Sequence, residues 1–229
     1  MVYLIPSFLS EDAVETIPAY VLEAIKNCQV IFAENERTAR RFLKSMDKEI
    51  VIDDYEWHTI HKAENEQINT FRQRIKEEKN IAILSEAGCP GIADPGQILV
   101  HEAQKLNAIV KPLVGPSSIL LALMASGLDG QRFCFEGYLP IDNLERNKKL
   151  KQLEEESLKK RSTQIFIETP FRNNKMLVAI LQNCQPSTLL CIAVEITSSQ
   201  EWIKTKTIAE WKNQKIDLHK KPVIFLLLA

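Results

Sequence analysis

The stretch Ser85–Gly96, "SEAGCPGIADPG", holds three of the chain's seven glycines and two of its ten prolines. It follows the apolar run Ile81–Leu84, which reads as a buried strand, and it precedes "QILVHEAQKL", which reads as a helix. Glycine allows a positive φ and a close approach of the backbone to a ligand, whereas proline stiffens a turn. Loops at the carboxyl ends of parallel strands are where open α/β sheets bind ligands. We therefore predict a rigid pocket here, lined by backbone groups.

A second loop, "GPSS" at residues 115–118, follows the strand-like segment 108–114 in the same way. One such loop is compatible with a plain connection between strand and helix, but two that together hold four of the seven glycines favour a binding site. The sequence contains neither GxGxxG nor GxxxxGK[ST], and the charged residues of the first loop are Glu86 and Asp94. A cationic or zwitterionic ligand therefore suits this pocket better than a triphosphate.

Short apolar runs alternate with longer amphipathic stretches along the chain, which predicts βαβ units around a parallel sheet. Asn35 is expected to cap the helix that follows it. In the first half, the expected strands are 2–5, 29–33, 49–53, 81–84 and 108–114, and the expected helices are 11–27, 36–46, 63–79, 97–106 and one that starts at 119. In the second half, the expected strands are 133–135, 163–168, 189–195, 200–207 and 222–228, and the expected helices are a charged one after Pro140, 172–184 and 207–214.

The composition of the sequence changes near Tyr138–Pro140, where a strand-like segment ends and the charged helix begins. We predict a domain boundary there, with an N-terminal α/β domain at 1–137 that carries both glycine loops and a C-terminal α/β domain at 138–229. The first carries 14 basic and 20 acidic residues, a net charge of −6, and the second carries 15 and 10, a net charge of +5. A polyanionic partner of the second domain would explain this split, and so would a solvated charged helix.

Composition indicates an ordinary globular protein, because 45% of the residues are hydrophobic. The first residues lack the basic region of a signal peptide and the last apolar segment is too short to span a bilayer, so we expect a cytoplasmic protein without a membrane partner. The five cysteines are scattered and form no CxxC pair, which argues against both a disulfide framework and a zinc site. We expect no metal.

Three segments in order, "LSEAGCPGIADPG", "LVGPSSILLALMASGL" and "RFCFEGYLP", resemble the tetrapyrrole methylase superfamily, the class III S-adenosylmethionine-dependent methyltransferases. The resemblance is greatest to the branch that methylates small-subunit ribosomal RNA, and it extends through "IETPFRNNKMLVAILQ" and "AVEITSSQEWIKTKTIAE". It implies an α/β protein with an N-terminal parallel sheet flanked by helices and a smaller C-terminal mixed-sheet domain. It also implies S-adenosylmethionine bound in the cleft between the domains, and a homodimer.

The resemblance places the methyl donor against both glycine loops and against one turn of the C-terminal domain. The donor-binding residues it implies are Ser85, Glu86, Ala87, Gly88, Pro90, Gly91, Asp94, Ser117, Ser118, Glu168, Thr169 and Pro170. The chemistry agrees, because the donor's sulfonium is positive and is better matched by carbonyls and carboxylates than by an anion-binding loop. Methyl transfer mainly requires in-line alignment of the acceptor oxygen and the methyl group in a dry cleft.

The acceptor side departs from the family pattern. After the first strand the chain has "PSFLS" where the branch has a Pro-Ile-Gly-Asn turn, and after the second it has "ENER" where the branch has Glu-Asp-Thr-Arg. The branch's His-Glu-His-Asn stretch is matched only loosely by "YEWHTIHKAENE". Catalytic candidates are Glu34, Arg37 and His58. An imidazole at His58 or His61 is suited to remove a hydroxyl proton, and an exposed loop with incidental histidines is the alternative.

We therefore predict an S-adenosylmethionine-dependent methyltransferase that acts on a ribose 2′-hydroxyl of small-subunit ribosomal RNA. Its expected partners are ribosomal RNA or the small ribosomal subunit, with Arg172 as a candidate RNA contact. One alternative is a methyltransferase of a small molecule such as a tetrapyrrole precursor. Another is a catalytically inactive ribosome-binding or regulatory module, which the altered "PSFLS" and "ENER" segments leave open.

Overall fold

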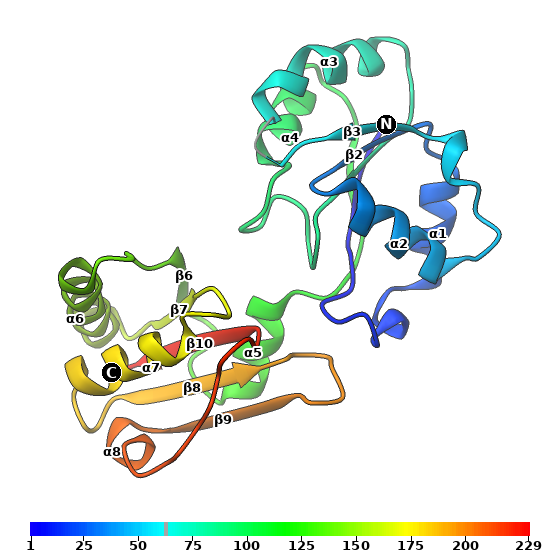
Figure 1. Cartoon of the computed structure of the whole chain (residues 1–229). Helices are drawn as coiled ribbons and strands as arrows, with labels where there is room; N and C mark the ends of the chain where they lie inside the picture. The colour runs from blue at the N-terminus through cyan, green and yellow to red at the C-terminus, as the bar shows by residue number, and fades with distance from the viewer. Residues whose placement is uncertain (62–63) are drawn as a thin grey trace. The chain divides into compact units, whose positions relative to one another are not determined.

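The computed structural model describes residues 1–61 and 64–229. The chain divides into two compact units, Met1–Ser117 and Ser118–Ala229 (Figure 1). Each unit is built on one five-stranded sheet. The expected α/β fold, with a parallel N-terminal sheet and a mixed C-terminal sheet, is confirmed.

The first sheet has the strand order β3-β2-β4-β1-β5, and every neighbouring pair is parallel. Its strands are β1 (Val2–Ile5), β2 (Val30–Ala33), β3 (Glu56–Thr59), β4 (Ile81–Leu84) and β5 (Val110–Pro112). All residues of β2 and β4 are buried, which explains why they read as unbroken apolar runs. Because the strands are parallel, their carboxyl ends meet at one edge of the sheet.

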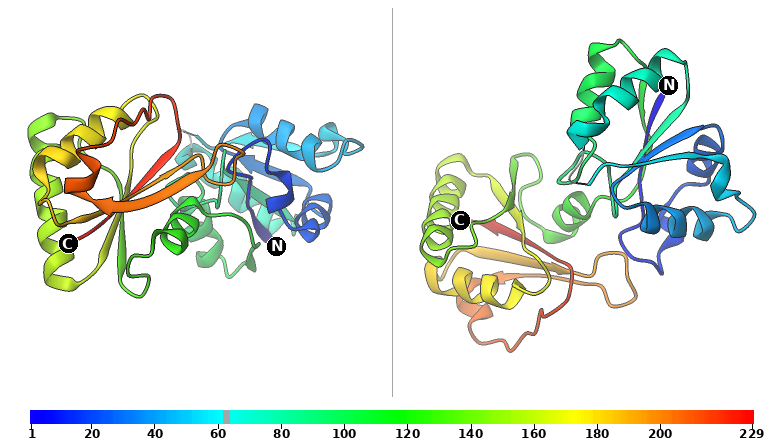
Figure 2. Two further views of the ribbon diagram at one scale, coloured as in Figure 1. Left: turned by 90° about the horizontal axis from the view of Figure 1, so that it is seen from below. Right: turned by 45° about the horizontal axis from the view of Figure 1, so that its top comes forward.

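Helices cover both faces of this sheet (Figure 2). They are α1 (Ala19–Lys26), α2 (Glu36–Met46), α3 (Ile68–Lys76) and α4 (Gln97–Lys105), with the 3-10 turns η1 (Val14–Thr16), η2 (Ile52–Asp54) and η3 (Glu64–Gln67). One core contains α1 and α2 side chains, and the other contains α3 and α4 side chains. Along β2, Ile31 and Ala33 belong to the first core while Val30 and Phe32 belong to the second, as the alternation of a strand requires.

Several expected boundaries are wrong in this unit. The helix expected at 11–27 begins only at Ala19, because Pro18 cannot occupy a helix interior. The strand expected at 49–53 is absent from the described residues, which have the turn η2 there and the half-buried edge strand β3 after it. The helix expected from Ala63 begins outside the described residues, and its α-helical part starts at Ile68. The Asn35 cap is confirmed, since its side chain accepts a hydrogen bond from the Arg37 N–H at 3.0 Å.

The second sheet has the order β6-β7-β10-β8-β9. The pair β6–β7 is parallel, and the other three pairs are antiparallel. Its strands are β6 (Phe133–Tyr138), β7 (Thr163–Ile167), β8 (Leu189–Val194), β9 (Trp202–Thr207) and β10 (Val223–Leu228). Its helices are α5 (Ser118–Ser126), α6 (Asn143–Lys160), α7 (Asn173–Asn183) and α8 (Ile208–Trp211).

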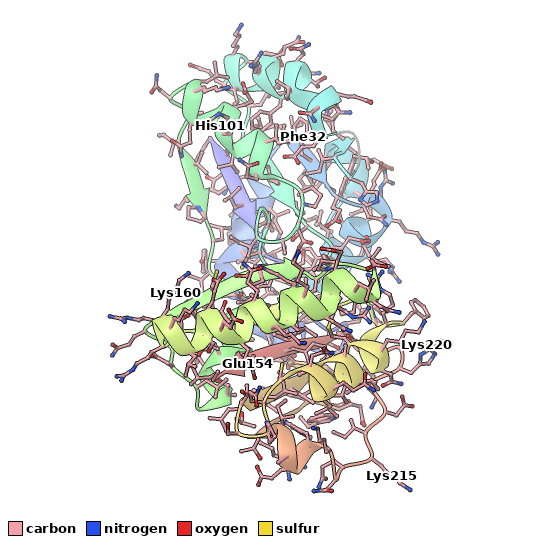
Figure 3. All side chains as sticks on the ribbon, turned by 90° about the vertical axis from the view of Figure 1, so that its left-hand side faces the viewer. Phe32, His101, Glu154, Lys160, Lys215 and Lys220 are labelled. Atoms are coloured by element: carbon pink, nitrogen blue, oxygen red, sulfur yellow. The ribbon has the colours of Figure 1, made fainter. Side chains whose placement is uncertain are left out.

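Side chains of α6, α7 and α8 share one core with Val223, Phe225 and Leu227 of β10. In Figures 1 and 3, α6 and α7 lie side by side. The structural division between the units falls before α5, about twenty residues earlier than the boundary expected at 137/138. The reason is that α5 packs on β8, β9 and β10, and Thr205 Oγ1 donates a hydrogen bond to the Ser126 carbonyl at 2.6 Å. Within the described residues, the helices are too short or too polar to cross a membrane.

Candidate active site

The loops that follow β1 and β4 are joined at the carboxyl edge of the first sheet. Ser7 N–H donates to the Gly88 carbonyl at 2.8 Å, and Gly88 N–H donates back to the Ser7 carbonyl at 3.0 Å. The buried Ser7 hydroxyl also donates to the Ser85 carbonyl at 3.0 Å. The first turn of the glycine loop is therefore held by the segment "PSFLS".

Glycine is required at three points of these loops for different reasons. Gly88 and Gly91 have φ values of +73° and +78°, a region that L side chains rarely adopt. The Gly91 N–H donates to the Pro95 carbonyl at 3.1 Å and closes a turn within the loop. At Gly115 the reason is space, because an added Cβ would lie 2.1 Å from the Cβ of Pro6. The loops after β1, β4 and β5 thus form one closely packed edge.

The N-terminus of α4 is already occupied by a carboxylate of the chain. Glu64 Oε1 accepts hydrogen bonds from the N–H groups of Gly96, Ile98 and Leu99, at 3.0, 2.9 and 3.2 Å. In phosphate-binding loops this position receives the anionic ligand. The capping by Glu64 therefore agrees with the absence of a phosphate-binding motif from the sequence.

Three carboxylates gather around the glycine loop. Glu34, which follows β2, accepts a hydrogen bond from the Glu86 N–H at 3.0 Å. Thr38 Oγ1 donates to Glu86 Oε1 at 2.9 Å. Burial of Asp94, with the charges of Glu34 and Glu86 nearby, raises the pKa of the Asp94 carboxyl to about 7. This edge of the sheet concentrates negative charge, which favours a cationic ligand.

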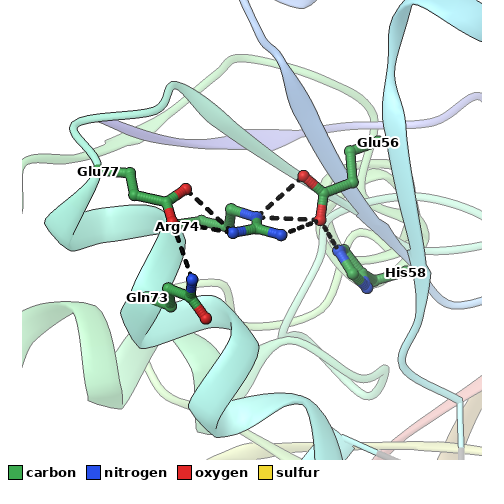
Figure 4. Close-up of polar contacts among 5 residues, drawn as sticks. All are labelled: Glu56, His58, Gln73, Arg74 and Glu77. Atoms are coloured by element: carbon green, nitrogen blue, oxygen red, sulfur yellow. Dashed lines mark hydrogen bonds and ion pairs between the residues drawn. The ribbon is translucent and has the colours of Figure 1, made fainter.

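The predicted catalytic residue His58 lies in a different network. Its Nε2 is 2.7 Å from Glu56 Oε1, and its ring stacks on Phe32 with the centroids 4.7 Å apart. Arg74 from α3 donates to Glu56 through both Nε and Nη2, and it also pairs with Glu77 (Figure 4). These bonds to Arg74, and secondarily to His58, hold the pKa of Glu56 below its usual value. His58 therefore has a clear packing role on β3.

The structure does not join the three predicted catalytic residues. Arg37 is exposed in the first turn of α2, and no hydrogen bond or ion pair links it with Glu34 or His58 within the described parts of the chain. The histidine beside Glu34 is instead His61, whose Nδ1 is 3.8 Å from Glu34 Oε1. The catalytic assignment of Glu34, Arg37 and His58 stays a prediction.

In the second unit, Glu168 anchors the turn that follows β7. Its buried Oε1 accepts hydrogen bonds from the Thr169 N–H at 2.6 Å and from Arg172 Nε and Nη2 at 2.9 and 2.6 Å. The predicted RNA contact Arg172 thus has its charge paired inside its own turn. Ser117 and Ser118, both half-buried, end the first unit and begin α5. Their donor contacts, and those of Glu168, Thr169 and Pro170, stay predictions.

Sequence reasoning missed three residues that shape the loops: Ser7, Thr38 and Glu64. Ser7 could have been predicted from the sequence, because it lies just after a parallel strand, at the carboxyl edge of the sheet where such folds bind ligands. Thr38 and Glu64 gave no local signal, since each acts on a segment more than thirty residues away in the sequence. The described residues contain no group of three or more His, Cys, Asp or Glu side chains arranged to hold a metal ion.

The fold is that of solved methyltransferases. The crystal structure of the methyltransferase CobJ matches 99% of this chain and 93% of its own with a TM-score of 0.67 at 15% identity. The Thermus thermophilus uroporphyrin-III C-methyltransferase complexed with S-adenyl homocysteine matches 99% of this chain and 96% of its own, with a TM-score of 0.57 at 14% identity. Identities this low establish the fold alone.

The family follows from sequence. Residues 12–212 match the family model of the tetrapyrrole (corrin/porphyrin) methylases, so the chain belongs to this family, as its loop motifs indicated. The expected enzyme class, a methyltransferase, is confirmed. The ribosomal RNA small subunit methyltransferase I of Buchnera aphidicola subsp. Schizaphis graminum is 32% identical over 100% of this chain and 78% of that relative.

Proposed function

We propose that the chain transfers a methyl group from S-adenosylmethionine to a ribose 2′-hydroxyl of small-subunit ribosomal RNA. The observation that carries this proposal is the 32% identity with the Buchnera relative over the full length of the chain, since that relative's name states its substrate. The 2′-hydroxyl as acceptor comes from the motif resemblance. A cytoplasmic location follows from this substrate.

The loop chemistry supports S-adenosylmethionine as the donor. A methyltransferase of the same fold was solved with S-adenyl homocysteine, the product of such a donor. The sulfonium is cationic until the methyl group leaves, and Glu34, Glu86 and Asp94 supply negative charge around the glycine loop. We place the donor against loop residues of the first unit and assign further contacts to the start of α5 and to the turn after β7. The residues are Ser85, Glu86, Ala87, Gly88, Pro90, Gly91, Asp94, Ser117, Ser118, Glu168, Thr169 and Pro170.

The transfer itself forms a bond between the ribose oxygen and the methyl carbon and breaks the carbon–sulfur bond, which leaves a neutral thioether. The hydroxyl must lose its proton in the same process, so the acceptor side needs a base or a path to water. We retain Glu34, Arg37 and His58 as acceptor-side candidates. Glu34 also holds the donor loop by accepting a hydrogen bond from the Glu86 N–H. Substitution of Glu34 should therefore affect donor binding as well as the acceptor side.

A transfer assay with labelled donor tests the proposal. Purified protein is incubated with methyl-tritiated S-adenosylmethionine and with small ribosomal subunits, naked small-subunit RNA or a tetrapyrrole precursor. We expect label in RNA, at one nucleotide whose 3′ phosphodiester resists alkali, because a methylated 2′-oxygen cannot attack the phosphate. Label in the tetrapyrrole would favour the small-molecule alternative, and binding of subunits without transfer would favour an inactive module. Sedimentation equilibrium tests the proposed homodimer.

A further inference from the structure

A pocket of about 490 Å³, open to solvent, lies between α6 and α7 in the second unit. Its lining is rich in amide and cationic side chains and contains no carboxylate. The residues that line it are Asn143, Arg146, Asn147, Asn174, Lys175, Val178, Ala179 and Gln182. Figure 3 looks onto the two helices that form it.

Arg146 is the unusual member of this pocket, because it is buried and pairs with no carboxylate among residues 1–61 and 64–229. Only 7% of Arg146 is exposed. Its Nη2 donates to Asn143 Oδ1 at 2.7 Å and its Nη1 donates to the Ile141 carbonyl at 3.3 Å, so both acceptors are neutral. Its Nε has no hydrogen-bond partner among the described residues. A buried cation without a counter-charge is costly, and an anion in the pocket would remove that cost.

A second unsatisfied atom lies on the next residue of the same helix. Asn147 Oδ1 is buried and also lacks a partner within the described residues. Two neighbouring acids are already hydrogen-bonded: Asp142 caps α6 by accepting from the Leu144 N–H, and Asp217 accepts from the lining residue Asn174 through its Nδ2 at 2.7 Å. The pocket lining thus includes an arginine with one unpartnered N–H and an asparagine with one unpartnered oxygen, on consecutive residues of α6.

We propose that this pocket binds a ribose-phosphate segment of the RNA substrate; the RNA part of this proposal rests on the proposed function. A phosphate supplies the counter-charge that the Arg146 guanidinium lacks, and the Asn147 amide group hydrogen-bonds a ribose 2′-hydroxyl. Lys175, exposed at the rim, adds a second positive charge, and the exposed Val178 side chain packs against the sugar. Arginine, lysine and asparagine are the usual contacts of nucleic-acid backbones, and a 2′-hydroxyl contact distinguishes RNA from DNA.

Two variants that leave the buried Arg146 in place test the pocket. Binding of a labelled twelve-nucleotide single-stranded RNA, and of DNA of the same sequence, is followed by fluorescence anisotropy over a range of salt. Lys175→Gln should weaken binding of both by about three- to tenfold and reduce the salt slope by about one phosphate contact. Asn147→Ala should weaken RNA binding and leave DNA binding unchanged. Lys215→Gln is the matched control, an exposed lysine of the same unit outside the pocket.

The outcomes separate this inference from the proposed function. If the wild type methylates ribosomal RNA while both variants bind RNA as it does, the pocket assignment is wrong and the proposed function stands. If the wild type neither methylates nor binds RNA, inorganic phosphate is titrated while the Arg146 Nε–H resonance is followed by nuclear magnetic resonance. A saturating shift then supports an anion pocket that is not for RNA, and an unmoved resonance overturns the pocket altogether.

Discussion

Gly115 packs so closely on Pro6 that a Cβ atom at position 115 would lie 2.1 Å from the Cβ of Pro6. Contact at this distance cannot be tolerated, so any side chain must push the β1 loop away from the β5 loop. The β1 loop also carries Ser7, which is bonded to Gly88 of the glycine loop. A single close approach therefore connects all three loops of the proposed donor site.

Gly115→Ala should disturb this connection. We expect a loss of about 1 to 3 kcal/mol in the free energy of unfolding and at least a tenfold loss of S-adenosylmethionine affinity, because the displaced Pro6 carries Ser7 with it. Urea denaturation and calorimetry measure the two effects. Gly130→Ala is the matched control, since its Cβ would meet nothing within 4 Å, and it should leave both quantities unchanged. Equal behaviour of the two variants would refute the connection.

Gly91→Val should separate donor binding from folding. The φ of +78° at Gly91 is strained for a β-branched residue, although an added Cβ would meet its nearest neighbour at 3.6 Å and would not clash. We expect a folded protein whose donor affinity falls at least tenfold, or about 1.4 kcal/mol. Gly91→Asn is the control, because asparagine tolerates a positive φ, and it should bind the donor better than the valine variant. If the folded valine variant bound S-adenosylmethionine as tightly as the wild type, the loop would only connect β4 to α4 and would not bind the donor.

The sequence predicted the structure correctly where a local conformation requires a particular type of residue. Glycines with positive φ, the Asn35 cap and the apolar runs of β2 and β4 follow from local rules. It was uninformative where tertiary contacts decide, as with the polar edge strand β3, which is stabilised through Glu56 by Arg74 from a later helix. The same holds for Glu64, which caps α4 from more than thirty residues away. His58 attracted attention as a titratable group, yet its position in β3 opposite Phe32 gives it a packing role that no spacing in the sequence indicates.

Arg37→Ala and Glu34→Gln should behave differently. Arg37 is exposed and has no bond to the donor loop within the described residues, so its loss should lower turnover and leave donor affinity nearly unchanged. Glu34 holds the Glu86 N–H at 3.0 Å, and its neutral variant should weaken donor binding as well as turnover. Steady-state kinetics and donor calorimetry measure the two quantities. Unchanged turnover in Arg37→Ala would remove that residue from the acceptor side.

Asp94→Asn should stabilise the protein without its donor above neutral pH. The pKa of Asp94 is about 7 in the folded chain and near its ordinary value of 3.8 when unfolded. The folded protein therefore keeps a proton that the unfolded chain releases, and stability falls as pH rises from about 4 to about 7. The asparagine variant escapes this loss and should gain about 1 to 3 kcal/mol at pH 8, with solvent screening of a half-buried carboxylate reducing the full linkage value. Urea denaturation at pH 5 and pH 8 measures the gain, which should be smaller at pH 5.

Ionisation of Asp94 should strengthen donor binding, although it lowers the stability of the donor-free protein. Ionised Asp94 attracts the sulfonium of S-adenosylmethionine, so wild-type affinity should rise several-fold between pH 6 and pH 8 as the group loses its proton. S-adenosylhomocysteine lacks the methyl group and carries a neutral sulfur, so its affinity should change less over this range. Asp94→Asn should flatten the pH dependence for S-adenosylmethionine and bring the two ligands closer in affinity at pH 8. Calorimetry with both ligands measures these differences. Parallel pH profiles for the two ligands in the wild type would show that Asp94 does not sense the sulfonium charge, and the placement of the donor beside this carboxylate would then be wrong.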